Sequence, residues 1–141
     1  MRNPLPGIAA VVLAAGLSAR PALPSFITTA SGLQYVDMRV GKGKPPAAGQ
    51  TCAVLYREWL YQNNQRGRMV ASAQNAGKPF RFTLGQGQVI AGWDEGMQTM
   101  KPGGKRVLIV PPELGYGDAG AGDDIPPGAT LLVEVDLLTA R

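Results

Sequence analysis

Glycine and proline interrupt this chain at short intervals, with 19 glycines and 12 prolines spread along its 141 residues. So many are unusual in a helical protein and are typical of short strands joined by tight turns. They follow no repeating period, which argues against a collagen-like or low-complexity chain. At this length, with 45% hydrophobic residues, the chain can build one core, whereas two domains would each be uncomfortably small. The sequence therefore predicts one domain built mainly from short strands.

Residue types that the sequence lacks exclude several kinds of active site. There is no histidine, so the usual general base and the commonest metal ligand are missing. The one cysteine, Cys52, can form neither an internal disulfide nor a cysteine-based zinc site, and we expect it to be a small buried hydrophobe. The acids Asp118, Asp123 and Asp124 lack the spacing of a calcium loop. We therefore expect no metal site and no cofactor.

The charge pattern does not favour a nucleic-acid partner. Fourteen basic and ten acidic residues are interspersed and give a net charge of +4. A nucleic-acid binder usually gathers its basic residues on one face, with aromatic residues between them. The nearest approach to such a cluster is Arg57 with Arg66 and Arg68, which we expect to form a solvated loop edge.

The first 19 residues have the order of a secretory signal. Arg2 precedes an apolar run over 8–17, and small residues follow it. The run is shorter than the roughly 20 residues that span a bilayer, so we expect no stable membrane insertion after processing. The expected organisation is a signal over 1–19, a linker over 20–30 and a domain over 31–141, with the protein exported to the periplasm or to another compartment outside the cytoplasm. The alternative is an N-terminal extension on a cytoplasmic protein.

Apolar and alternating segments predict five to six strands and one helix. The expected strands are 32–40, 51–61, 69–72, 80–84, 105–110 and 130–138. The polar run 62–68 and the stretch 111–129, rich in glycine and proline, are expected to be loops. Ile90, Trp93, Met97 and Met100 recur three, four and three residues apart, which places them on one face of a helix. These elements predict an α+β fold, a twisted antiparallel sheet wrapped across one short helix.

Aromatic residues beside turns are the remaining candidates for a site. They are Tyr56, Phe80, Phe82, Trp93 and Tyr116. An ordinary strand core explains Phe82. Trp93 differs, because it begins the predicted helix directly after a glycine, where an indole ring can form the floor of a cavity. The spacing alone supports a pocket and an ordinary core equally.

Four motifs, in order, resemble those of the FKBP-type peptidyl-prolyl cis-trans isomerases. They are KPFRFTLG over 78–85, VIAGWDEG over 89–96, PPELGYG over 111–117 and IPPGATL over 125–131. The resemblance covers about 110 residues and implies an FKBP-like fold. It also implies an isomerase that assists folding by rotating the bond before a proline. That rotation must overcome amide resonance, a barrier of about 18–20 kcal/mol, and needs no proton transfer. In a chain without histidine, we expect its rate to depend little on pH between about 6 and 8.

The resemblance also implies which residues act. Trp93 is expected to be the floor of an apolar pocket, with Tyr56, Phe80 and Tyr116 as walls. The backbone N–H of Ile90 and the hydroxyl of Tyr116 are expected to donate hydrogen bonds to substrate carbonyls. The other residues expected to contact the substrate are Met69, Val70, Val89, Ile125 and Val133. The implied partners of this expected monomer are proline-containing polypeptides and macrolide ligands of the rapamycin type.

Four positions depart from the family pattern. Val70 stands where family members carry an aspartate that accepts a hydrogen bond from the tyrosine matching Tyr56. Met69 and Val133 replace aromatic residues, and Ala121 replaces a histidine. These changes predict a wider and less polar pocket than usual. They leave an alternative function, a catalytically weak or inactive module that binds a proline segment of a partner protein.

Overall fold

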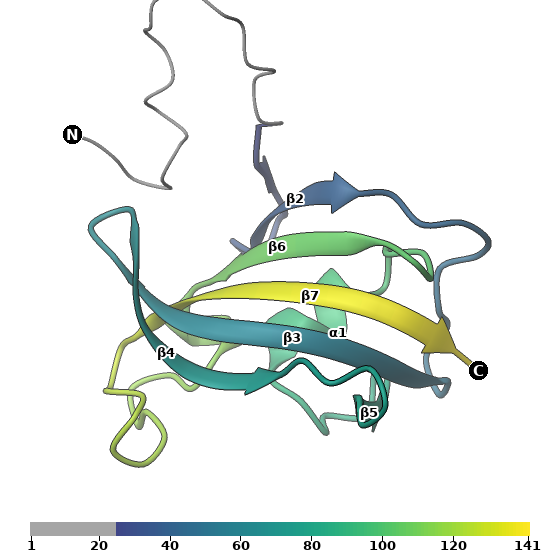
Figure 1. Cartoon of the computed structure of the whole chain (residues 1–141). Coiled ribbons are helices and arrows are strands. Elements are labelled where there is room, and N and C mark those ends of the chain that lie inside the picture. The colour runs from purple at the N-terminus through teal and green to yellow at the C-terminus, as the bar shows by residue number, and fades with distance from the viewer. Residues whose placement is uncertain (1–24) are drawn as a thin grey trace, which may run out of the picture.

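An antiparallel sheet forms most of the computed structural model, which describes residues 25–141 (Figure 1). The strands are β1 (Ile27–Thr28), β2 (Gln34–Arg39), β3 (Thr51–Gln62), β4 (Gln65–Ala73), β5 (Phe80–Thr83), β6 (Lys105–Val110) and β7 (Thr130–Ala140). They are ordered β1-β2-β6-β7-β3-β4, and β5 pairs with β3. The predicted α+β fold is confirmed, with seven strands among residues 25–141 where we expected five to six. The predicted signal over 1–19 lies outside the described residues.

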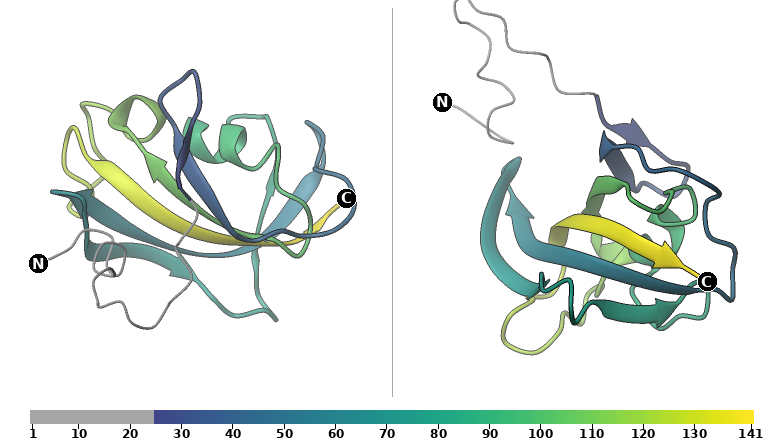
Figure 2. Two further views of the ribbon diagram at one scale, coloured as in Figure 1. Left: turned by 90° about the horizontal axis from the view of Figure 1, so that it is seen from above. Right: turned by 45° about the vertical axis from the view of Figure 1, so that its right-hand side comes forward.

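One face of the curved sheet is covered by the short helix α1 (Ala91–Gly96) and by the 3₁₀ helix η3 (Pro112–Leu114) (Figure 2). The main hydrophobic core fills the space between α1 and the sheet. A second, smaller cluster lies on the other face of the sheet. It consists of Val36, Trp59, Val107 and Leu132, with Phe26 and Tyr61 packed against it. Within the described part of the chain, no helix is long and apolar enough to cross a membrane.

The helix is shorter than its apolar spacing predicts. Met97 is the C-cap of α1, so Met97 and Met100 lie outside the α-helix although both are buried. The chain continues in tighter turns, with the Met100 N–H donating to the Met97 carbonyl at 3.2 Å. Glycine at position 96 weakens the helix, and a turn of three residues keeps the same side chains facing the core. The apolar stripe therefore predicted burial correctly and helix length wrongly.

The segment over 62–68 is a β-hairpin, and the prediction of a loop was wrong. Asn63 and Asn64 have φ angles of 52° and 60°, and the residues flanking them, Gln62 and Gln65, are register partners. Two consecutive residues with positive φ make a tight hairpin turn, a conformation that asparagine tolerates better than most residues. The polar residues that suggested a loop are the two turn residues, Asn63 and Asn64, and the exposed first residues of β4.

The three arginines predicted to lie at a solvated loop edge belong to strands β3 and β4 instead. Arg57 forms an ion pair with Glu134 of β7. The Arg66 guanidinium lies 4.5 Å from the centre of the Trp59 ring. Arg68 donates to the backbone carbonyl of Asp124 at 2.9 Å.

The sheet also begins earlier than expected. β1 pairs with β2 through Ile27 and Tyr35, within the segment over 20–30 that was predicted to be a linker.

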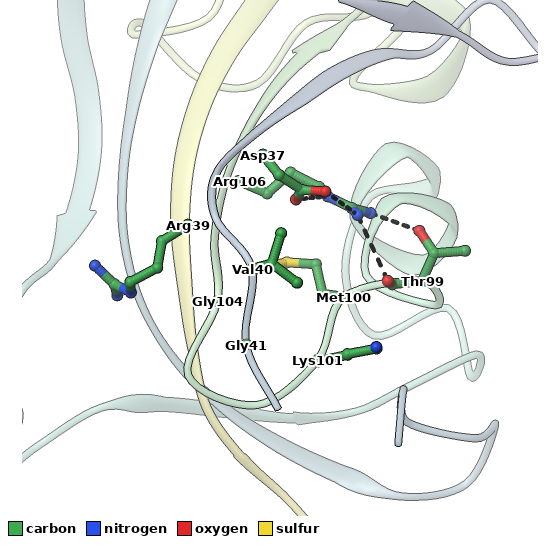
Figure 3. A pocket seen from close by; sticks show the side chains of 9 residues that line it. All are labelled: Asp37, Arg39, Val40, Gly41, Thr99, Met100, Lys101, Gly104 and Arg106. Atoms are coloured by element: carbon green, nitrogen blue, oxygen red, sulfur yellow. Dashed lines mark hydrogen bonds and ion pairs between the residues drawn. The ribbon is translucent and has the colours of Figure 1, made fainter. Parts of the chain in front are cut away.

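Close packing and one buried arginine hold α1 on strand β6. A methyl group at Gly92 would come within 2.7 Å of Val110, so only glycine allows the helix to lie so near. Arg106 of β6 donates to both carboxylate oxygens of Asp37, at 2.7 and 3.0 Å (Figure 3), and to the Gly96 carbonyl at 2.7 Å. The last bond satisfies a carbonyl at the helix C-terminus. The cavity beside this network is lined by none of the residues predicted for the functional site.

Candidate functional site

Four aromatic rings meet at the start of α1. The Trp93 indole is buried, and its ring centre lies 4.8 Å from that of Tyr56 on β3, at an interplanar angle of 79°. Phe80 and Phe82 of β5 lie 6.0 and 5.9 Å from Trp93, also edge to face. The pairing of β5 with β3, in which Phe80 lies opposite Val54, brings these residues together. Edge-to-face packing at such distances is the arrangement that aromatic rings favour. Three of the four residues predicted to be catalytic therefore form one cluster.

Tyr116, the fourth, follows η3 and is 36% exposed. Its ring makes no stacking contact with another aromatic ring of the described residues, but its hydroxyl lies in the electrostatic field of the same region. Burial raises the pKa of Tyr116, and the negative charges of Glu58 and Tyr56 raise it further. The phenol therefore keeps its proton at neutral pH and remains a hydrogen-bond donor. Phe80 is exposed to a similar degree, 37%, so both rings offer surface to a ligand.

Val89 and Ile90 lie directly before α1 and are half-buried against the main core. Ile90 is the N-cap of α1, and its carbonyl accepts the Trp93 N–H at 2.9 Å. No hydrogen bond in the described part of the chain uses the Ile90 N–H as a donor. That N–H is therefore available to an acceptor that a ligand supplies.

The remaining predicted residues occupy different environments. Ile125 and Val133 are buried in the main core, and Val70 is half-buried against it. Met69 is 43% exposed on β4 and lies opposite Trp59, which belongs to the cluster on the other face of the sheet.

Glu58 is a buried acid that the sequence analysis missed. It follows Tyr56 by two positions on β3, is 4% exposed, and its Oε2 is the one buried side-chain polar atom without a hydrogen-bond partner among the described residues. Burial raises the pKa of Glu58 to about 7. Glu58 therefore titrates between about pH 6 and 8 although the chain has no histidine, and the small dependence of the rate on pH in this range stays a prediction. Strand alternation was the signal that pointed to Glu58, because it places Tyr56, Glu58 and Leu60 on one face.

Comparison with known proteins assigns the chain and its fold to a family. Residues 42–138 match the family model of the FKBP-type peptidyl-prolyl cis-trans isomerases. The chain belongs to this family. The resemblance found in the four motifs is thereby confirmed, and membership supports an isomerase type of function.

Relatives and solved structures agree with membership of the FKBP family. An FK506-binding protein of Neisseria meningitidis serogroup B is 48% identical over 107 residues, which are 76% of this chain and 94% of the relative. The crystal structure of AtFKBP13 matches with a TM-score of 0.74 and 38% identity, covering 84% of this chain and all of that one. FkpA from Escherichia coli matches with a TM-score of 0.72 and 38% identity, over 82% of this chain and 51% of FkpA.

Family membership leaves the cellular compartment open. A Drosophila melanogaster relative named as a 39 kDa FK506-binding nuclear protein is 43% identical over 117 residues, which are 83% of this chain and 32% of the relative.

Proposed function

We propose that this protein is an active peptidyl-prolyl cis-trans isomerase that assists the folding of proline-containing chains. The observation that carries the proposal is the buried Trp93 indole with Tyr56 and Phe80 packed edge to face against it. A proline ring that lies over Trp93 would be surrounded by apolar surface. The amide before it would leave water on entering the site.

The proposed catalysis needs no acid or base. Twisting the amide breaks its resonance and makes it less polar, so a dry aromatic surface favours the twisted form over the planar one. The unused Ile90 N–H and the Tyr116 hydroxyl would donate hydrogen bonds to substrate carbonyls and hold the segment in place. The bond before proline suits this mechanism because its cis and trans forms differ by only about 0.5–1 kcal/mol, so both are populated.

A second function, binding without catalysis, is favoured by one observation. Val70 cannot accept a hydrogen bond from Tyr56, so one polar anchor expected of an FKBP pocket is missing at that position. In this alternative the same surface holds a proline segment of a partner protein. Macrolides of the rapamycin type, like the FK506 in the names of its relatives, would compete for that surface under either function.

An isomerisation assay on short proline peptides separates the two functions. Wild-type protein should accelerate cis-to-trans conversion, and Trp93→Leu should bind the peptide more weakly yet keep part of the activity, because leucine still excludes water. Binding of the peptide without acceleration would establish the alternative. A folded Trp93→Leu protein without any activity would instead point to an electronic role of the indole.

We also propose that the protein is exported, on the basis of the basic, apolar and small residues that follow one another over 1–19. N-terminal sequencing of protein from the native cell should find a chain that begins near Arg20. Recovery of protein with an intact Met1 from the soluble cytoplasm would contradict export.

A further inference from the structure

Glu58 lies on the face of β3 that carries the candidate site. Alternation along the strand places it between Tyr56 of the aromatic cluster and Leu60 of the main core. Its register partners are Ala71 on β4 and Val133 on β7. Neither partner can donate a side-chain hydrogen bond, so the sheet on both sides of Glu58 offers the carboxylate only apolar neighbours.

The ionisable groups around Glu58 leave its carboxylate without a compensating cation. Tyr56 on the same strand and Tyr116 beyond η3 are the groups whose pKa its charge raises. Both are neutral phenols in the range where Glu58 titrates. The nearest charged residues along the strands, Arg57 of β3 and Glu134 of β7, pair with each other. A buried carboxylate is normally paired or hydrogen-bonded, because leaving it bare costs free energy.

We propose that Glu58 is a specificity-determining residue of this site, selecting proline-containing segments that carry a lysine or arginine next to the proline. This inference rests on the proposed function, because it assumes that such a segment lies over Trp93. Oε2 has an unused acceptor position, and the Glu58 charge acts on both Tyr56 and Tyr116. Because Oε2 is buried, the Glu58 side chain must turn toward the ligand, where a cationic side chain would supply both the missing donor and the missing charge. Hydrogen bonds between ionised groups are stronger than those between neutral ones.

The selection depends on pH because only the ionised carboxylate attracts a cation. Burial raises the pKa of Glu58 to about 7, so the group is largely ionised at about pH 8 and largely neutral at about pH 6. Lysine and arginine keep their charge throughout this range. The preference is therefore strong above neutrality and weak below it.

Calorimetric titration with paired peptides tests the inference. One pair differs by lysine or norleucine before the proline, and a second pair by the same residues after it, so that only the ammonium group changes. At about pH 8 wild-type protein should bind the lysine peptide of at least one pair about ten-fold more tightly, and the preference should nearly vanish at about pH 6. Glu58→Gln should remove the preference, whereas Glu113→Gln, at an exposed position, should keep it.

Each outcome of the titration decides the question. Equal binding of lysine and norleucine in both pairs, or a preference that survives in Glu58→Gln, would overturn the inference. If Glu58→Gln does not fold, the pH dependence in the wild type decides alone, because a preference equal at both pH values would exclude Glu58. If the titration shows no lysine preference but the isomerisation assay shows that the norleucine peptides are converted, the proposed function stands and only this inference fails. Failure of all four peptides to bind would overturn both.

Discussion

Gly96 of helix α1 lies so close to Leu108 of strand β6 that a methyl group on its Cα would come within 2.8 Å of the leucine Cδ2. Leu108 is fully buried and cannot move aside freely. Gly96→Ala should therefore destabilise the protein by about 1–2 kcal/mol in urea denaturation, because overpacking outweighs the better helix propensity of alanine. Leu108→Val removes the clashing δ-methyl groups, so the double variant should lose less than the sum of the two single losses. Additive losses would contradict the contact.

Tyr116→Phe should lower kcat/KM for proline peptides by about two- to ten-fold, the equivalent of one hydrogen bond. The phenol donates one bond among several contacts and transfers no proton in the proposed mechanism. The measurement is a peptide isomerisation assay on wild type and variant, with circular dichroism to verify the fold. Complete loss of activity in a folded variant would assign Tyr116 a role in proton transfer.

The stability of the protein should fall as pH rises through the titration of Glu58. Burial raises the pKa of this carboxyl from 4.5 to about 7, so the folded state holds the proton more tightly than the unfolded chain. The resulting loss in the free energy of unfolding begins above about pH 4.5, is complete above about pH 7 and reaches about 3 kcal/mol.

Glu58→Gln should remove this dependence. Relative to wild type, the variant should gain about 3 kcal/mol in urea denaturation between about pH 4 and pH 8. Glu113→Gln is the control for a glutamate that is exposed. A stability difference that does not change with pH would show that Glu58 is ionised in the folded state without penalty.

Val70→Asp should tighten the binding of rapamycin-type macrolides several-fold, because an acceptor near Tyr56 would orient the phenol for about 0.5–1.5 kcal/mol. A register shift between Glu58 and Trp59 leaves Val70 without a partner on β3, and Val70 packs against the main core on the same face as Glu58, so the new carboxylate would lie on the side of an existing one. The gain should therefore be larger in the Glu58→Gln background, where no like charge opposes it. Unchanged or weaker binding by both folded variants would contradict the alignment of this strand.

The sequence predicted the parts of the molecule that local pattern determines. Alternation and apolar runs identified most strands, and the motif around Trp93 indicated the ring that Tyr56 and Phe80 contact. Composition failed at Asn63 and Asn64, because polar residues are common in loops and in two-residue hairpin turns alike. Periodicity failed beyond Met97, because tight turns can bury the same positions as a helix. Glu58 was missed because an acid is normally solvated, although strand alternation places it on the buried face with Tyr56 and Leu60.

The two faces of the sheet also give the protein two separate optical reporters. Its two tryptophans are Trp93 in the aromatic cluster and Trp59 in the cluster on the opposite face, where the guanidinium groups of Arg57 and Arg66 lie 5.2 and 4.5 Å from its ring. Trp59→Phe would leave Trp93 as the single indole emitter, so its fluorescence would follow occupancy of the candidate site. Trp93→Leu would leave Trp59, whose emission would follow unfolding without interference from the ligand. Fluorescence of the two single variants thus reports binding and stability separately.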